Sequence, residues 1–204
     1  MSPRDRVKLA ARPVAPGLVF VMALVFVLGG NVAGAADGRA GALTAPARGG
    51  WLDVPFVRQE KNGCGPAAIA MVMGYWRAHG FAAPGSDAGD GSIMAAVYSD
   101  ALKGTPGSAM RRYFEQSGFR AFVFQGEWSD LERQIGQGRP LIVALRESRS
   151  FHYAVVAGVD TQQGLVLLND PARRKLLQTD RAEFERAWNA AGRWTLLAVP
   201  GQRR

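Results

Sequence analysis

The sequence contains a single cysteine, Cys64, among 204 residues, and only two histidines, His79 and His152. One cysteine excludes an internal disulfide, so the folded domain has to be stable through its hydrophobic core alone. Basic residues outnumber acidic ones, with a formal net charge of +8, but no block of five or more Lys or Arg occurs. We therefore expect a solvated, mildly basic surface and no nucleic-acid-binding function.

Long apolar runs are also missing. The uncharged apolar run at residues 18–28 has 11 residues, whereas a membrane-spanning helix needs ~20. The run follows Arg4 and Lys8 and precedes Ala33-Gly34-Ala35, an order typical of a secretory signal peptide. We predict a signal peptide at residues 1–35, with an uncleaved anchor as the alternative. The protein is then expected to be exported, either periplasmic or anchored to the outer side of the inner membrane.

The remaining chain divides into a linker and one domain. Residues 36–50 are rich in Gly, Ala and Arg without an apolar period, which is typical of a flexible linker. The folded domain is predicted at residues 51–204. Apolar side chains cover nearly every face of the segment 66–78, as expected of a helix buried in the middle of a domain.

The order of elements predicts an α+β fold. Residues 92–102 and 107–118 are expected to form short helices beside the central helix, and residues 80–90 a surface loop. Short runs rich in Val, Leu and Ile follow, which is typical of an antiparallel sheet. The predicted strands are residues 119–124, 140–145, 153–159, 165–168 and 194–199. Capping-box spacings at Ser129 and Asp180 predict two further helices, ending near residues 137 and 188.

Cys64 stands at the start of the central helix, in the sequence Gly63-Cys64-Gly65-Pro66. Unpaired N–H groups and the positive end of the helix dipole favour thiolate over thiol at such a position. Flanking glycines would leave room for a substrate carbonyl. We predict that Cys64 is a nucleophile; the alternative is a buried structural cysteine.

A thiolate that cleaves amides also needs a proton donor. His79 would lie at the far end of the central helix, ~20 Å from Cys64 at ~1.5 Å per residue. His152, at the start of a predicted strand, is the remaining histidine. Asp170, at the end of the next strand, is expected to orient it, with Asn169 as the second choice. Gln59, five residues before the cysteine, could supply an oxyanion-hole amide.

These segments together resemble the double-glycine leader peptidases, the bacteriocin-processing branch of the papain-like cysteine peptidases, and their stand-alone relatives. The resemblance covers VPFVRQEKNGCGPAAIAMVMGYW, PLIVAL, FHYAVVAGVD and VLLNDP. It implies a papain-like fold in which the central helix starts at the nucleophile and packs on the C-terminal sheet. It also implies Gln59 as oxyanion residue, Cys64 as nucleophile, His152 as base and Asp170 as its partner.

Two features depart from the members fused to exporters. These members commonly carry an acidic residue before the cysteine and one more residue between Gln and Cys, whereas Gly63 precedes Cys64 here. The sequence also shows neither a transporter membrane domain nor a nucleotide-binding domain. We therefore expect a substrate among exported or secreted proteins, and a secretion-apparatus partner, but no nucleotide.

The predicted function is hydrolysis of a peptide bond by a cysteine endopeptidase that needs no metal or cofactor. Two alternatives use the same residues. One is an amidase or transpeptidase that acts on cell-wall peptides, because a triad sets the reaction class and the groove sets the substrate. The other is a non-catalytic module that binds a peptide for a secretion system.

Overall fold

The computed structural model describes residues 50–81, 90–148 and 150–201, and the fold below is that of these residues. The predicted signal peptide at residues 1–35, the predicted linker at residues 36–50 except its last residue, and most of the predicted loop at residues 80–90 lie outside them. None of the helices in the described ranges has the length and apolar character needed to cross a membrane. In chain order the elements are α1 (Cys64–Ala78), α2 (Asp90–Val97), α3 (Gly107–Gln116), β1 (Phe119–Gln125), α4 (Trp128–Gly136), β2 (Leu141–Glu147), β3 (Ser150–Asp160), β4 (Leu165–Asn169), β5 (Leu177–Asp180), α5 (Arg181–Asn189) and β6 (Trp194–Pro200).

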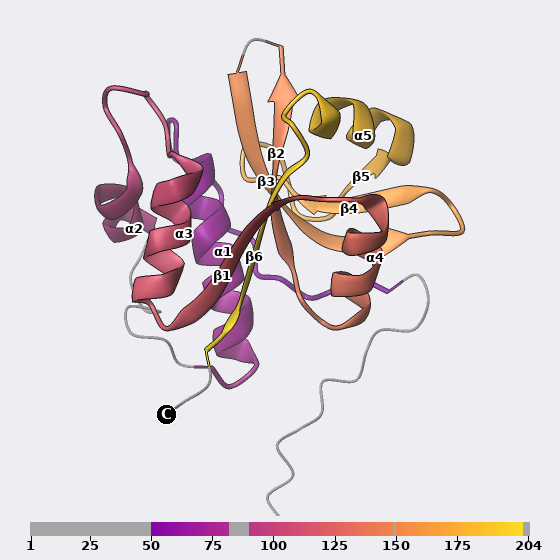
Figure 1. Ribbon diagram of the computed structural model, residues 1–204, viewed down its shortest axis with the longest axis horizontal. Coiled ribbons are helices and arrows are strands. Elements are labelled where there is room, and N and C mark those ends of the chain that lie inside the picture. Colours follow the sequence, from indigo (N-terminus) through magenta and orange to yellow (C-terminus); the bar gives the residue numbers. More distant parts are fainter. Residues whose placement is uncertain (1–49, 82–89, 149, 202–204) are drawn as a thin grey trace, which may run out of the picture. The chain divides into compact units, whose positions relative to one another are not determined.

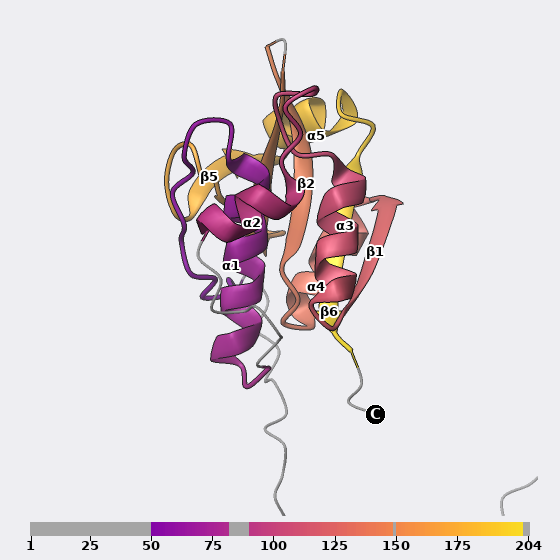
Figure 2. The same cartoon turned by 90° about the vertical axis from the view of Figure 1, so that its left-hand side faces the viewer.

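The strands form one antiparallel sheet in the order β1-β6-β2-β3-β4-β5. Helices α1, α2 and α3 lie on one side of it, and α4 and α5 lie on the other (Figure 1). In the view of Figure 2 the first three helices stand in front of the sheet. Helix α1 contacts β3 and β6, α3 contacts β1, and α5 contacts β2, β4 and β5. The predicted α+β fold is confirmed.

Helix α1 is the centre of the helical layer, as its all-round apolar sequence predicts. Ten of its residues, from Gly65 to Trp76, are buried. Two polar groups on its buried face donate to backbone carbonyls: the Tyr75 hydroxyl to Gly138 at 2.8 Å and the Trp76 indole N–H to Ala198 at 2.9 Å. These bonds satisfy the polar atoms of large side chains that otherwise contribute apolar burial. They fix the position of α1 relative to β6 and to the turn before β2.

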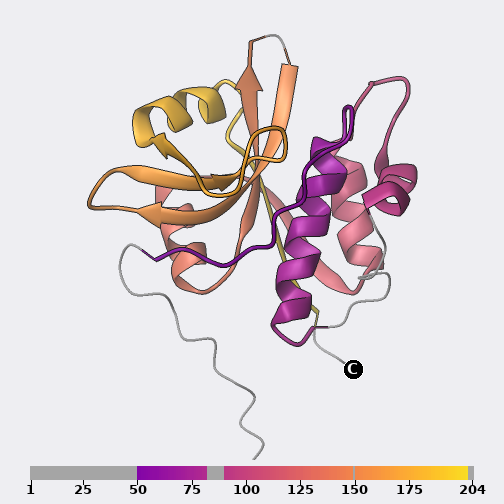
Figure 3. The same ribbon diagram turned by 180° about the vertical axis from the view of Figure 1, so that it is seen from behind.

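The segment before α1 crosses the sheet and leads to the start of α1 (Figure 3). Trp51 pairs with Gly158 of β3, and the Leu52 N–H donates to the Ala157 carbonyl at 2.7 Å. A Cβ at Gly158 would stand 2.9 Å from the Cβ of Trp51 and 2.8 Å from Leu167 Cδ1. Only glycine therefore allows this segment to lie on the sheet at this point.

Three secondary-structure predictions need correction. Strand β5 was not expected; its half-exposed sequence LQTD lacks an apolar pattern, and it forms by pairing with β4 at the sheet edge. The helix expected at residues 92–102 ends at Val97, because Ser99 and Gly104 pair across a tight turn. The N-cap of α4 is Glu127, two residues before the predicted cap Ser129, and the Asp130 carboxylate accepts from the Glu127 backbone N–H.

Candidate active site

Cys64 is the first residue of α1, and its thiol is half-buried. The preceding Gly63 has no side chain to cap the helix, and the first turn carries no acidic residue. The first backbone N–H groups of a helix have no partner within it, and those near Cys64 are not taken by a side-chain cap. The Gly65 N–H hydrogen-bonds to the sulfur of Cys64. The helix start therefore favours negative charge on this thiol.

The glycines beside Cys64 also have a packing role that the sequence analysis did not foresee. A Cβ at Gly65 would lie 2.6 Å from the Cβ of Thr105, and a Cβ at Gly63 would lie 3.0 Å from Met94 Cε. Both distances are shorter than ordinary carbon contacts. The segments that carry Thr105 and Met94 can therefore pack directly on the start of α1 because neither flanking residue has a side chain.

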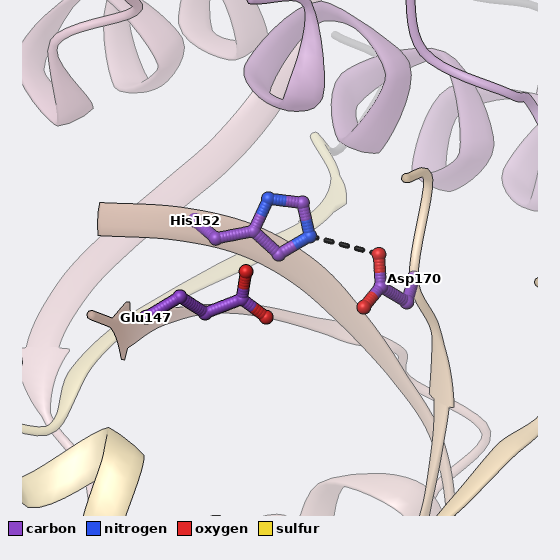
Figure 4. A group of neighbouring side chains, drawn as sticks. All are labelled: Glu147, His152 and Asp170. Atoms are coloured by element: carbon purple, nitrogen blue, oxygen red, sulfur yellow. Dashed lines mark hydrogen bonds and ion pairs between the residues drawn. The ribbon is translucent and has the colours of Figure 1, made fainter. Parts of the chain in front are cut away.

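His152 lies on β3 with only 7% of its surface exposed, and its side chain hydrogen-bonds to the sulfur of Cys64. Its other partner is Asp170: the His152 Nε2 to Asp170 Oδ1 distance is 2.8 Å (Figure 4). Because Nε2 is used by Asp170, Nδ1 is the ring nitrogen left for Cys64. The alternative histidine, His79, is the C-cap at the opposite end of α1, where its Nδ1 lies 2.7 Å from the Tyr75 carbonyl oxygen.

Asp170 directly follows β4 and is 2% exposed. Its Oδ1 also accepts from the Ala172 N–H at 2.9 Å, which fixes the carboxylate against the chain. Asn169, the other candidate, has separate partners: its Nδ2 donates to the Val54 carbonyl at 3.0 Å, and its Oδ1 accepts from the Leu176 N–H at 3.0 Å. The structure therefore brings Asp170 to His152 and gives Asn169 a backbone-bridging position.

The ionisations of Cys64 and His152 are coupled. Burial raises the pKa of Cys64, but hydrogen bonds from His152 and the Tyr153 N–H and the charge of His152 outweigh it, so this pKa lies below that of an ordinary thiol. Burial lowers the pKa of His152, but hydrogen bonds with Asp170 and Cys64 and their negative charges raise it to about 10. Between these two pKa values the pair is a thiolate and an imidazolium ion.

Asp170 remains charged beside this pair. Burial raises its pKa, but the hydrogen bond with His152, the charge of His152, the Ala172 N–H and the charge of Arg173 hold it below the usual value. A charged carboxylate is the form that accepts the Nε2 proton and stabilises an imidazolium. The three groups thus form one chain of hydrogen bonds, from Asp170 through His152 to Cys64.

Gln59 lies beside this chain. Its backbone N–H donates to the Pro171 carbonyl at 3.0 Å, so the turn that carries Asp170 also positions Gln59. The Gln59 side-chain Oε1 is buried and has no hydrogen-bond partner within the described residues. Since Gln59 lines the same groove as Cys64, its Nε2 amide is the donor available to a group bound there.

A groove of about 640 Å³ runs past Gln59, Cys64 and His152. Its two walls come from different layers of the fold: the turn before α3 on one side, and the β2–β3 hairpin with the start of β6 on the other. The apolar side chains Leu102 and Phe151, 69% and 59% exposed, lie on these two walls. The lining residues are Gln59, Asn62, Cys64, Leu102, Lys103, Gly104, Thr105, Pro106, Ala144, Glu147, Ser150, Phe151, His152, Tyr153, Ala191 and Trp194.

Glu147 and Arg173 are site residues that the sequence analysis missed. One donor atom from each of Glu147, His152 and Asp170 lies within 4.8 Å of the others, a set that could hold a metal ion (Figure 4). Arg173 is paired with both carboxylates, at 3.1 Å from Glu147 Oε1 and 3.5 Å from Asp170 Oδ2. A metal ion would have to displace these ion pairs and the His152–Asp170 hydrogen bond. The arrangement therefore favours control of the imidazole over metal binding.

Comparisons with known proteins identify the family and the fold. The model of the Peptidase_C39 like family matches residues 51–196. A search of curated proteins gives no match. Among solved structures, a double glycine motif protease from an AMS/PCAT transporter, in complex with the leader peptide, is 20% identical with a TM-score of 0.58; the match covers 76% of this chain and 97% of that one.

Two further structures have the same fold. The peptidase domain of Streptococcus ComA, a bifunctional ABC transporter involved in quorum sensing, is 19% identical with a TM-score of 0.57, over 72% of this chain and 98% of that one. A protein of Bacillus anthracis described as a C39-like peptidase is 16% identical with a TM-score of 0.56, over 74% and 96%. The predicted resemblance and papain-like fold are thus confirmed. The chain belongs to the Peptidase_C39-like family and is a cysteine peptidase.

Proposed function

We propose that this protein hydrolyses a peptide bond in an exported or secreted protein, with Cys64 as nucleophile, His152 as acid and base, Asp170 as its orienting partner and Gln59 in the oxyanion hole. One observation carries the proposal: His152, held by Asp170 at 2.8 Å, and Cys64 at the start of α1 line the same open groove. The family match supports the reaction class.

The reaction begins with attack of the Cys64 thiolate on the substrate carbonyl carbon, which forms a carbon–sulfur bond. The carbonyl oxygen becomes an oxyanion, and the N–H at the start of α1 and the Gln59 Nε2 amide are the donors placed to bind it. His152 Nδ1 then gives its proton to the leaving amine as the carbon–nitrogen bond breaks. The products are a thioester on Cys64 and a released fragment with a new amino terminus.

Hydrolysis of the thioester restores the enzyme. His152, now neutral, removes a proton from a water molecule that attacks the thioester carbon. The carbon–sulfur bond breaks, the carboxylic acid product leaves, and Cys64 is again a thiolate beside the imidazolium. Asp170 keeps the ring in one orientation in both steps and stabilises its charged form.

The substrate and location are part of the proposal. Apolar residues 18–28 behind basic residues favour export, so the substrate is proposed to be a periplasmic or secreted protein, and the partner a component of a secretion system. The structure of the AMS/PCAT protease contains a bound leader peptide. This supports a peptide as the ligand of the groove beside Cys64. Gly63 stands where exporter-fused members commonly have an acidic residue, so cleavage after a double-glycine leader is tested with its own peptide.

The test is a cleavage assay with the purified full-length chain in detergent. We would incubate it with a proteome-derived peptide mixture and a double-glycine leader peptide, and identify new amino termini by mass spectrometry. We expect cleavage that is abolished in Cys64→Ala and His152→Ala. His79→Ala is the matched control, because its histidine lies at the far end of α1. No cleavage of peptides, but release of products from cell-wall fragments, would overturn the proposal in favour of wall-peptide chemistry.

A further inference from the structure

The imidazole of His152 has a second carboxylate beside it that the proposed mechanism does not use. The Glu147 carboxylate, at the end of β2, lies within 4.8 Å of a ring nitrogen of His152 and of a carboxylate oxygen of Asp170. In Figure 4 it stands next to the ring, while the hydrogen bond from the ring goes to Asp170. A small movement of the Glu147 side chain would therefore bring a second hydrogen-bond acceptor to the same imidazole.

Competition between Glu147 and Asp170 for the imidazole would disrupt the alignment of Asp170, His152 and Cys64. A hydrogen bond from His152 to Glu147 would turn the ring, because the two carboxylates lie in different directions from it (Figure 4). The ring would then no longer point one nitrogen at Asp170 and the other at Cys64. Two carboxylates this close also repel each other unless a cation neutralises them.

Arg173 is that cation. Its Nη2 donates to Glu147 Oε1 at 3.1 Å, and its Nε lies 3.5 Å from Asp170 Oδ2. The Arg173 backbone is held in the turn after β4: its N–H donates to the Asp170 carbonyl at 3.0 Å, and its carbonyl accepts from Arg58 Nη2 at 3.2 Å. One planar guanidinium with fixed donors thus contacts both carboxylates at once, which a single ammonium does less well.

We propose that Arg173 is a positioning residue of this peptidase: it holds Glu147 away from His152, so that Asp170 alone orients the imidazole toward Cys64. The inference rests on the proposed function, because it matters only if Cys64 and His152 act as a pair. It also connects the groove to that pair, since Glu147 lines the groove and is tied through Arg173 to Asp170.

The test is a double-mutant cycle read by alkylation of Cys64, the only thiol in the chain. Iodoacetamide is the probe, at about pH 6, where an ordinary thiol with a pKa of ~8.5 is almost wholly protonated. The rate constant is measured in the full-length wild type, Arg173→Gln, Glu147→Gln and the combined variant. Because exposed ion pairs are individually weak, we expect Arg173→Gln to be about three- to fivefold slower than wild type.

The combined variant decides the mechanism. If Arg173 acts by restraining Glu147, the combined variant should react as fast as Glu147→Gln alone, since no second carboxylate remains. Arg174→Gln, an exposed neighbour whose side chain lies outside this network, is the matched control and should react like wild type. The inference is overturned if Arg173→Gln is alkylated at the same rate as Arg174→Gln. It is also overturned if Arg173→Gln slows alkylation by the same factor in the Glu147→Gln background as in the wild type.

Failure of this inference can be told apart from failure of the proposed function. If wild type and His152→Ala are alkylated at the same rate at about pH 6, the thiolate–imidazolium pair is absent and the proposed function fails with it. If wild type is faster than His152→Ala while Arg173→Gln equals wild type, the pair exists and only the role of Arg173 is wrong.

Discussion

Replacing Asp170 by Asn should lower the pKa of His152 by a predictable amount. Burial lowers this pKa, but the hydrogen bond and the negative charge of Asp170, which is itself 2% exposed, do most to raise it to about 10. A hydrogen bond to a charged group contributes about 1.5–3 kcal/mol, and about 1.4 kcal/mol corresponds to one pH unit. We therefore expect the pKa of His152 to fall from about 10 to between about 8 and 9 in Asp170→Asn.

The assay is NMR titration of the histidine ring carbons. The chain has two histidines, so the signal of His152 is assigned by its persistence in His79→Gln. Asp53→Asn is the matched control, because that carboxylate pairs with Lys175 at the surface. An ordinary midpoint near 6.5 for His152 in the wild type, or equal midpoints in wild type and Asp170→Asn, would refute the reasoning.

The same shift has a consequence for stability. The folded-state pKa of His152 is raised from 6.5 to about 10, so its protonation stabilises the fold fully below pH 6.5. This contribution is lost as the pH rises through about 10. The difference in free energy of unfolding between wild type and Asp170→Asn should accordingly be largest near neutral pH and should shrink toward pH 10, as measured by urea unfolding.

Three further predictions concern the groove and its support. Gly65→Ala should lower the unfolding temperature in calorimetry, because its Cβ would stand 2.6 Å from the Cβ of Thr105 and overpacking costs about 1–3 kcal/mol. The control is Gly136→Ala, whose Cβ meets nothing within 4 Å. Equal unfolding temperatures for the two variants would contradict the packing argument. Gln59→Ala should lower kcat for a cleaved peptide by about 10²–10³, far more than it lowers the alkylation rate of Cys64; equal losses would indicate a purely structural residue. Asn169→Ala should destabilise the fold by about 1–3 kcal/mol in urea unfolding, because the buried Val54 carbonyl and the partly buried Leu176 N–H lose their partner. An unchanged midpoint would show that water replaces the amide.

Most elements of the fold follow from local patterns in the sequence. The apolar faces of residues 66–78 and the Val- and Leu-rich runs that become β2, β3, β4 and β6 are visible without a structure. Strand β5 is the exception, because its pairing with β4 rather than its composition makes it a strand. The start of α4 was also misplaced, since Glu127 and Asp130 form the cap in place of Ser129.

The candidate site residues also divide into those that the sequence indicates and those that only the structure reveals. Cys64, His152, Asp170 and Gln59 were predicted from residue type and position, and the structure places all four around one groove or in contact with its residues; their catalytic roles stay predictions. Glu147 and Arg173 gave no comparable signal. An acidic residue at the end of a strand and one arginine of an Arg-Arg pair are usually surface residues, and only their position around His152 and Asp170 distinguishes them.

By itself, the sequence determined that a lone cysteine begins a buried helix, that a histidine stands on one strand and that an aspartate directly follows the next strand, because helix polarity and strand alternation are local properties. Only the tertiary structure decided which polar groups meet. Asp170 reaches His152 because β3 and β4 pair antiparallel with Val155 opposite Asn169, and Asn169 is turned instead to Val54. The contact of Arg173 with two carboxylates likewise depends on β2 and the turn after β4 meeting in space, which no spacing along the chain encodes.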